Sequence, residues 1–202
     1  IKKKSLRNEV FTDADLKLGG KSQSCYMNMI LSEELTQEWI DADDELIYDT
    51  AMKSMNNHSF ILLDWISKKQ PLTADSTSTS ELIAAHLAAS KTIFSNKTIY
   101  DWIIKHDEYL PIRMLADNLN VVRAANKPCS DTFRLFGGRL NVRIGLLAEC
   151  KEEDLLKIDH IQGKLNPADL GTKVLEGRTF EIVRKLVGLD MVFSSEDEID
   201  QN

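Results

Sequence analysis

The chain contains few cysteines, glycines and prolines, and it has no long apolar run. Its three cysteines, at positions 25, 129 and 150 of 202, lack C-x-x-C spacing, which argues against a disulfide framework or a zinc ribbon and favours a reducing compartment. Nine glycines and four prolines are too few for a fibrous chain. No segment approaches the about 20 apolar residues of a membrane helix. We therefore expect a soluble globular protein without a membrane partner.

The net charge of −7, taken as one number, argues against nonspecific nucleic-acid binding, which needs an excess of lysine and arginine. The acids are unevenly distributed, however. Eight lie between Glu33 and Asp49 without one basic residue, and four more lie between Glu196 and Asp200. Without these twelve the net charge is +5, so the remaining body can still bind nucleic acid.

Hydrophobic periodicity and turn residues predict an alternating order of strands and helices. Strands are expected over 9–16, 24–31, 59–66, 112–116 and 155–161, and helices over 78–104, 121–126, 141–150 and 179–187, with a further helix starting at Pro167. This order indicates one α/β domain, a five-stranded mixed sheet flanked by helices. Residues 9–193 would form the domain, after a linker over 1–8 and before a disordered acidic tail over 194–202. An acidic helical insertion is expected over 32–57, between the second and third strands.

Four carboxylates occupy positions unlike those of ordinary surface acids. Asp13 lies inside the first strand, and Glu81 opens the long helix. Asp117 ends the fourth strand, and Asp169 lies in a first helical turn after Pro167. A carboxylate within a strand costs desolvation energy, and converging carboxylates repel each other unless a cation lies between them. Hard divalent cations such as Mg²⁺ meet this need because they prefer oxygen ligands.

Five segments strengthen this interpretation: FTDAD, KSQSCYM, WISKKQPLTADSTSTSELIAA, LADNLNVV and NPADLGTK. In this order they resemble the patterns Y-S/T-D-A-D, K-S-T-S-G-Y, S-W-K-S-K-K-Q-P…S-S-T-E-A-E-Y, C-D-N-x-x-A/V and A-D-I-L-T-K. These patterns belong to the ribonuclease H domain that ends the polyprotein of copia-type (Ty1-like) LTR retrotransposons. The resemblance implies a ribonuclease-H-like fold over most of the chain.

At the matching positions, the resemblance implies that Asp13, Glu81, Asp117 and Asp169 are the four catalytic acids and the ligands of two Mg²⁺ or Mn²⁺ ions. The ions would bracket the scissile phosphate, one helping to generate hydroxide and the other stabilising the leaving 3′ oxygen. Asp13 would be the ligand shared by both ions. The implied activity is hydrolysis of the RNA strand of RNA/DNA hybrids, the strand that 2′-hydroxyl groups distinguish.

The resemblance also implies partners and a location. The activity would remove the RNA template during reverse transcription, beside an upstream reverse-transcriptase domain in a cytoplasmic virus-like particle or in the nucleus. Because the chain begins with Ile1 rather than methionine, we interpret it as a piece of a larger polyprotein whose oligomeric state is open. The side chains expected to contact the hybrid are Lys68, Lys69, Asn118, Arg143 and Lys173.

The chain departs from the family pattern at several places. Thr79 replaces the first glutamate of E-A-E, Cys25 replaces the glycine of the second strand, and RLNVRIGL keeps Arg143 but none of the histidines of K-H-I-D-I-R-Y-H. These changes concern substrate binding more than the metal site. We expect Asp15 to have a structural or supporting role. His160 is expected to lie in the last strand rather than to act as a mobile catalytic histidine.

Two alternatives keep the fold and change the function. One is a domesticated, non-catalytic interaction module in which the acidic insertion and tail bind a partner. It would explain the insertion, but a dead domain has no reason to keep all four acids. The other is a DNA-cutting enzyme of the integrase type, whose D…D-E order fits less well than the order found here.

Overall fold

The computed structural model describes residues 6–32, 37, 61–99, 111–126 and 138–189. The expected acidic tail lies outside these residues, and so does almost all of the expected acidic insertion. Within the described part of the chain, no helix is long and apolar enough to cross a membrane.

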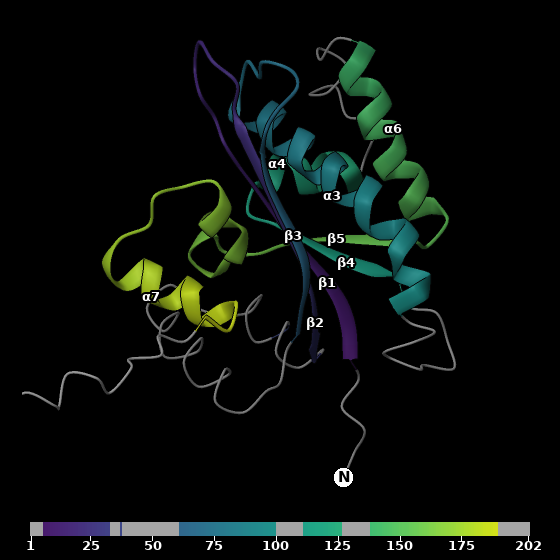
Figure 1. Cartoon of the computed structure of the whole chain (residues 1–202). Helices are drawn as coiled ribbons and strands as arrows, with labels where there is room; N and C mark the ends of the chain where they lie inside the picture. Colours follow the sequence, from purple (N-terminus) through teal and green to yellow (C-terminus); the bar gives the residue numbers. More distant parts are fainter. Residues whose placement is uncertain (1–5, 33–36, 38–60, 100–110, 127–137, 190–202) are drawn as a thin grey trace, which may run out of the picture.

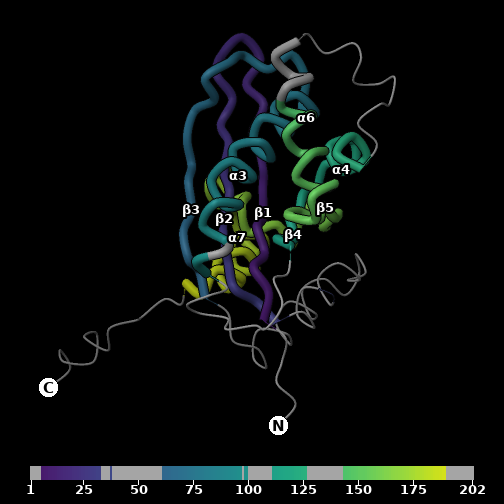
Figure 2. Tube along the Cα trace, turned by 90° about the vertical axis from the view of Figure 1, so that its right-hand side faces the viewer, coloured from purple at the N-terminus to yellow at the C-terminus, as the bar shows by residue number. Residues whose placement is uncertain are grey.

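The described residues form a five-stranded mixed sheet in the order β3-β2-β1-β4-β5. Its strands are β1 (Leu6–Asp15), β2 (Gln23–Ser32), β3 (Ile61–Lys69), β4 (Ile112–Ala116) and β5 (Leu156–His160). β1, β2 and β3 pair antiparallel and run side by side (Figure 2), whereas β4 pairs parallel with β1 and with β5. This is a ribonuclease-H-like sheet, so the predicted fold class is confirmed.

Helices cover both faces of the sheet (Figure 1). One face carries α3 (Thr77–Ile99), α4 (Leu119–Asn126) and α6 (Gly138–Glu152), and the other carries α7 (Gly177–Leu186) with the 3₁₀ helices η2 (Gly163–Leu165) and η3 (Pro167–Gly171). Successive strand residues point to opposite faces. Val10 and Met114 therefore enter the core under α3, while Phe11 and Leu115 enter the core under α7. All four are fully buried.

Several element boundaries differ from those predicted. β1 begins at Leu6, so residues 6–8 belong to the sheet rather than to a linker, because they pair with the end of β2. Ser32, the expected start of the acidic insertion, is the last residue of β2 and pairs with Leu6. The segment after Pro167 is a five-residue 3₁₀ helix instead of an α-helix. This short helix is important because it carries Asp169.

Candidate metal centre

Two of the four predicted acids meet because β1 and β4 are parallel neighbours. Thr12 of β1 is in register with Ala116 of β4, so Asp13 and Asp117 leave the same edge of the sheet. Asp13 is fully buried. The carboxyl ends of parallel strands are where α/β folds place functional groups, and here both ends supply a carboxylate.

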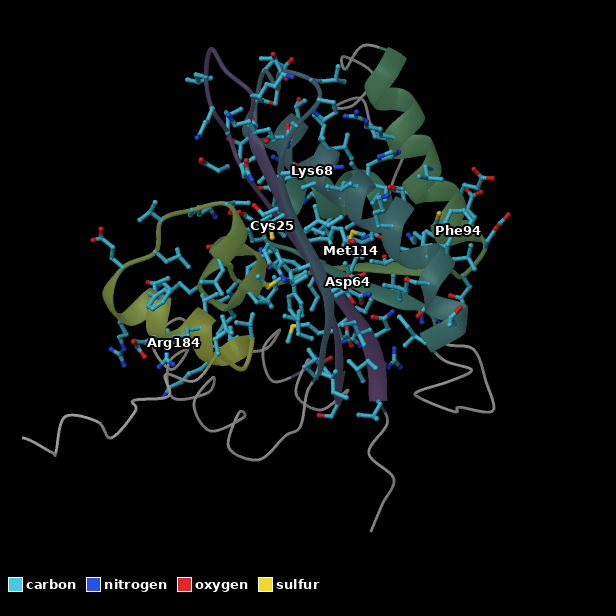
Figure 3. The ribbon with its side chains drawn as sticks, in the orientation of Figure 1. Cys25, Asp64, Lys68, Phe94, Met114 and Arg184 are labelled. Carbon is cyan, nitrogen blue, oxygen red and sulfur yellow. The ribbon has the colours of Figure 1, made fainter. Side chains whose placement is uncertain are left out.

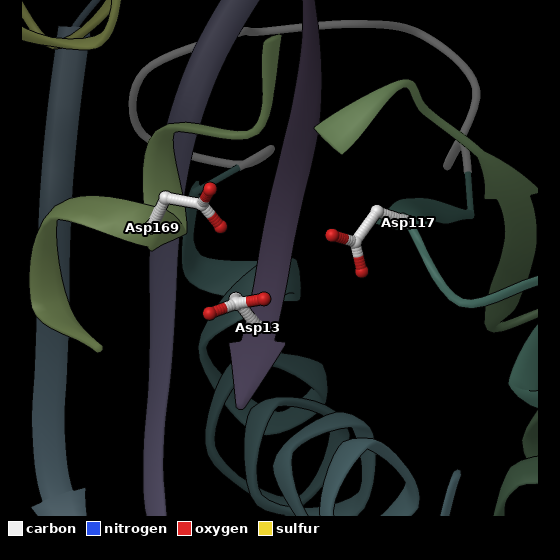
Figure 4. A group of neighbouring side chains, drawn as sticks. All are labelled: Asp13, Asp117 and Asp169. Carbon is white, nitrogen blue, oxygen red and sulfur yellow. The ribbon is translucent and has the colours of Figure 1, made fainter. Parts of the chain in front are cut away.

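Asp169 reaches the same edge through η3. Asn166 holds this segment: its side-chain Nδ2 donates to the carbonyl oxygen of Thr12 at 2.9 Å, and its Oδ1 accepts from the backbone N–H of Ala168 at 3.2 Å. Pro167, at the start of η3, has a fixed φ and needs no hydrogen-bond acceptor for its nitrogen. Asp169 is 6% exposed. One ligand oxygen from each of Asp13, Asp117 and Asp169 lies within 4.8 Å of the others, and the three carboxylates face a common space (Figure 4).

Glu81, on the second turn of α3, borders this cluster without being part of the 4.8 Å group. One side of its carboxylate accepts a hydrogen bond from the backbone of Ala14. The other oxygen, Oε2, is buried and has no hydrogen-bond partner. Burial, followed by the charges of Asp13 and Asp117, raises the pKa of Glu81 to about 9. A buried carboxylate oxygen without a hydrogen-bond partner, beside two like charges, is suited to contact a cation.

Two other acids of the cluster, Asp117 and Asp169, also have raised pKa values. Burial and then the charge of Asp13 raise the pKa of Asp117 above its ordinary value, and the same two causes raise the pKa of Asp169 to about 7. Carboxylates that must stay ionised at such a distance require a compensating cation. An oxygen-only donor set with high negative charge fits Mg²⁺ or Mn²⁺ better than zinc or copper. The residues present therefore fit the divalent cations that the motifs imply.

Two residues that follow η3 also contact the cluster, and this role was predicted for neither of them. The Lys173 ammonium lies 3.1 Å from Oδ1 of Asp13 and 2.9 Å from Oδ1 of Asp169. The Thr172 hydroxyl donates to Oδ2 of Asp13. The two acids raise the pKa of Lys173 above its ordinary value although burial opposes its charge. Lys173 was predicted to contact nucleic acid, and its spacing of four residues from Asp169 could have indicated an ion pair.

Two residues at and just after the end of β5, His160 and Gly163, lie next to Asp117. A Cβ atom on Gly163 would lie 3.2 Å from Oδ2 of Asp117, so the absent side chain leaves room for this carboxylate. His160, the last residue of β5, has Nε2 3.2 Å from the backbone oxygen of Asp117. The expectation that His160 lies in the strand is confirmed.

A basic pocket of about 300 Å³ lies between α3, α6 and the ends of β2 and β3. Lys68 and Arg143, which were predicted separately, both line it, and Lys91 and His86 join them. Figure 3 shows the position of Lys68 near the end of β3.

Lys69 is exposed at the end of β3. Oδ1 of Asn118 accepts from the backbone of Asn120 at 3.0 Å, at the start of α4. The roles of these residues in binding nucleic acid stay predictions.

No family model matches the chain. The retrovirus-related Pol polyprotein from transposon TNT 1-94 of Nicotiana tabacum is 25% identical over 162 residues, which make up 78% of this chain and 12% of that polyprotein. The chain thus spans about one eighth of the length of this relative. The resemblance to a retrotransposon polyprotein that the motifs indicate is confirmed by this match.

Two solved structures are similar at lower identity. LC11-RNase H1, isolated from compost, is 15% identical with a TM-score of 0.48, over 81% of this chain and 91% of that chain. The PFV RNase H domain is 12% identical with a TM-score of 0.41, over 90% of this chain and 92% of that chain. Since both TM-scores are under 0.5, the fold assignment rests on the strand order and directions described above.

Proposed function

We propose that this domain is a ribonuclease H, an endonuclease that hydrolyses the RNA strand of RNA/DNA hybrids with two divalent metal ions. The observation that carries the proposal is the convergence of three carboxylates from β1, β4 and η3, with ligand oxygens within 4.8 Å of one another. The order of the motifs over most of the chain and the similarity to a Pol polyprotein support it.

The chain's own residues have distinct roles in this proposal. Asp13, between Asp117 and Asp169, would contact both ions (Figure 4), and Glu81 would contribute its unpartnered Oε2. When bound, the ions would lower the pKa of water and stabilise negative charge that develops on the phosphate. The burial of Asp13, Glu81 and Asp169 keeps their donor atoms fixed and limits competing water. Lys173, whose side chain is 37% exposed, lies at the rim and can exchange its place at Asp13 for a cation.

The basic pocket would hold the backbone of the bound hybrid. His86 lies five residues after Glu81 on α3, about 7.5 Å along the helix axis. A strand whose scissile phosphate lies at the carboxylates could therefore continue along α3 to the charges of Lys68 and Arg143. Such phosphate contacts contribute affinity without base specificity. They fit an enzyme that recognises a hybrid by its shape and 2′-hydroxyl groups.

The biological setting follows from the resemblance. We propose that the activity removes the RNA template during reverse transcription, next to a reverse-transcriptase domain of the same polyprotein. The cytoplasmic particle or the nucleus is the proposed location.

One observation favours the non-catalytic alternative. Lys173 already supplies a positive charge to Asp13 and Asp169, so these two acids could persist as an ion-pair network in an interaction module. Glu81 and Asp117 lie outside these ion pairs, and the pKa of each is raised. Metal binding accounts for the presence of all four acids, whereas the ion pairs with Lys173 account only for Asp13 and Asp169.

The test is cleavage of a labelled RNA/DNA hybrid with and without Mg²⁺, beside duplex DNA and duplex RNA of the same sequence. The proposal predicts metal-dependent cuts in the RNA strand of the hybrid alone. Cleavage of duplex DNA would instead support the integrase-type alternative. Absence of cleavage from every substrate, with Mg²⁺ or Mn²⁺, would support the non-catalytic module.

A further inference from the structure

Gly171, the last residue of η3, lies unusually close to the sheet. A Cβ atom added at this position would lie 2.9 Å from Cβ of Cys25, closer still to its Sγ, and 3.2 Å from Cβ of Ser67. Side-chain carbons do not approach other heavy atoms under 3.0 Å without displacement. Cys25 is fully buried within β2 (Figure 3), so it cannot move aside into solvent. Any residue other than glycine would lift this segment from the sheet.

The close approach occurs over a row of residues that leads to the acids. Asp13, Cys25 and Ser67 are direct neighbours across β1, β2 and β3, so their side chains point to the same face. The Ser67 hydroxyl donates to the carbonyl oxygen of Gly171. Gln23 Nε2 donates in turn to the Ser67 hydroxyl at 2.7 Å. Gly171 is therefore held to β2 by packing and to β3 by a hydrogen bond.

Thr172 and Lys173, which follow Gly171 in the chain, both contact Asp13. Thr172 donates its hydroxyl to Asp13, and Lys173 places its ammonium 3.1 Å from the same carboxylate. Because the three residues are consecutive, the height of Gly171 over Cys25 sets where Thr172 and Lys173 lie relative to Asp13. A shift at Gly171 would move both side chains and the adjoining Asp169.

From this geometry we infer that Cys25 and Gly171 form a complementary steric pair that positions the 171–173 segment against Asp13. The family patterns K-S-T-S-G-Y and A-D-I-L-T-K have glycine at the position of Cys25 and leucine at the position of Gly171. This chain has the side chain on the strand and none on the segment. Cys25 is thus a positioning residue and not a nucleophile: burial and then the charge of Asp13 raise the pKa of its thiol to about 12.

The inference deepens the proposed function and rests on it for its catalytic consequence. Gly171→Ala should lower kcat for hybrid cleavage by roughly 10- to 100-fold, because small misplacements of a catalytic group have effects of this size. Cys25→Gly combined with Gly171→Ala should restore most of kcat, since only the 3.2 Å contact with Ser67 remains. Cys25→Ala with Gly171→Ala should recover less, because the Cβ of residue 25 stays 2.9 Å away. Gly145→Ala is the matched control, since a Cβ at Gly145 meets no atom within 4 Å.

The experiment measures kcat, KM and thermal unfolding of these five proteins, the wild type included, with cleavage assayed well below every melting temperature. Graded recovery of kcat from the single to the two double variants supports the pair. Full activity of Gly171→Ala, or a double variant no better than Gly171→Ala, overturns it. If the wild type itself fails to cleave, the proposed function fails, and the unfolding data decide the pair separately. Stability regained by Cys25→Gly in the Gly171→Ala background would support it, and a double variant no more stable than Gly171→Ala would overturn it.

Discussion

The ammonium of Lys173 lies 3.1 Å from Oδ1 of the fully buried Asp13. It also contacts Asp169, four residues earlier in its own segment, at 2.9 Å. One positive charge therefore faces two of the four carboxylates that converge at the edge of the sheet. We regard Lys173 as an internal counter-ion of these two acids, in competition with the cations that the same oxygens would bind.

Replacement of Asp13 by asparagine should abolish catalysis and leave the fold intact. The asparagine side chain would keep the shape of the aspartate but remove the charge that both ions would share, so hybrid cleavage should fall by more than about 100-fold. Cleavage rates and circular dichroism of the same preparation test this. Asp15→Asn, at the end of the same strand, is the control and should retain far more activity. Full activity of Asp13→Asn would contradict the assignment of the metal site.

Metal-free protein should become less stable as the pH rises from about 5 to about 9. The pKa of Glu81 is raised from its ordinary 4.5 to about 9 in the folded state. Between these values the native protein binds more protons than the unfolded chain, so the free energy of unfolding falls with increasing pH. Glu81→Gln should reduce this slope, and Glu153→Gln, at an exposed position, should not. Thermal unfolding in a chelator across this pH range is the measurement, and identical slopes in wild type and Glu81→Gln would contradict the prediction.

Replacement of Lys173 by methionine should have opposite effects in the absence and presence of metal. Without metal, Asp13 and Asp169 lose their counter-ion, and loss of one partner from a buried pair is destabilising. With Mg²⁺, the melting temperature should rise by more than in the wild type because no ammonium must be displaced. A ligand at 100 times its dissociation constant adds about 2.7 kcal/mol, so shifts of several degrees are measurable. Lys157→Met, on the exposed side of β5, is the control; a smaller Mg²⁺ shift in Lys173→Met than in the wild type would count against this competition.

Removal of a positive charge from the basic pocket should weaken binding of the hybrid and have little effect on the rate of the cleavage step. Lys68→Ala and Arg143→Ala should each raise KM for the hybrid with little change in kcat, because neither side chain belongs to the carboxylate cluster. Each lost phosphate contact should also reduce the slope of log affinity against log salt by about one. Lys157→Ala should change neither quantity. An unchanged salt slope in both pocket variants would exclude the pocket from the binding surface.

Much of the fold was predictable because the strands carry strong local patterns. The 112–116 strand was predicted with the bounds it has, and Asp13, Asp117 and Asp169 each lie within or directly after an element that the sequence predicts. Their convergence could be expected from motif order and from the behaviour of parallel strand ends. The early start of β1 was missed because Arg7 and Asn8 are polar, yet Asn8 is buried and bonded to Asn96 at 2.9 Å.

The remaining features depend on contacts between distant segments. Cys25 and Gly171 are far apart in the chain, and neither pattern alone reveals that one fills the space left by the other. Lys68 and Arg143 were identified one by one, but their meeting at one pocket depends on how α6 packs beside α3. Lys173 was predicted to contact nucleic acid because it lies beside motif residues. In the structure its ammonium contacts the carboxylates of Asp13 and Asp169. These positions are set by tertiary packing, and the periodicity of a local segment carries no information about contacts between distant segments.

The central claim is that the carboxylates of Asp13, Glu81, Asp117 and Asp169 hold divalent cations. Anomalous diffraction from crystals of the protein grown with Mn²⁺ and an uncleaved hybrid tests this most directly. The account predicts two Mn²⁺ peaks between the four side chains, with Lys173 displaced from Asp13. A site without Mn²⁺, in which Lys173 still bridges Asp13 and Asp169, would contradict it.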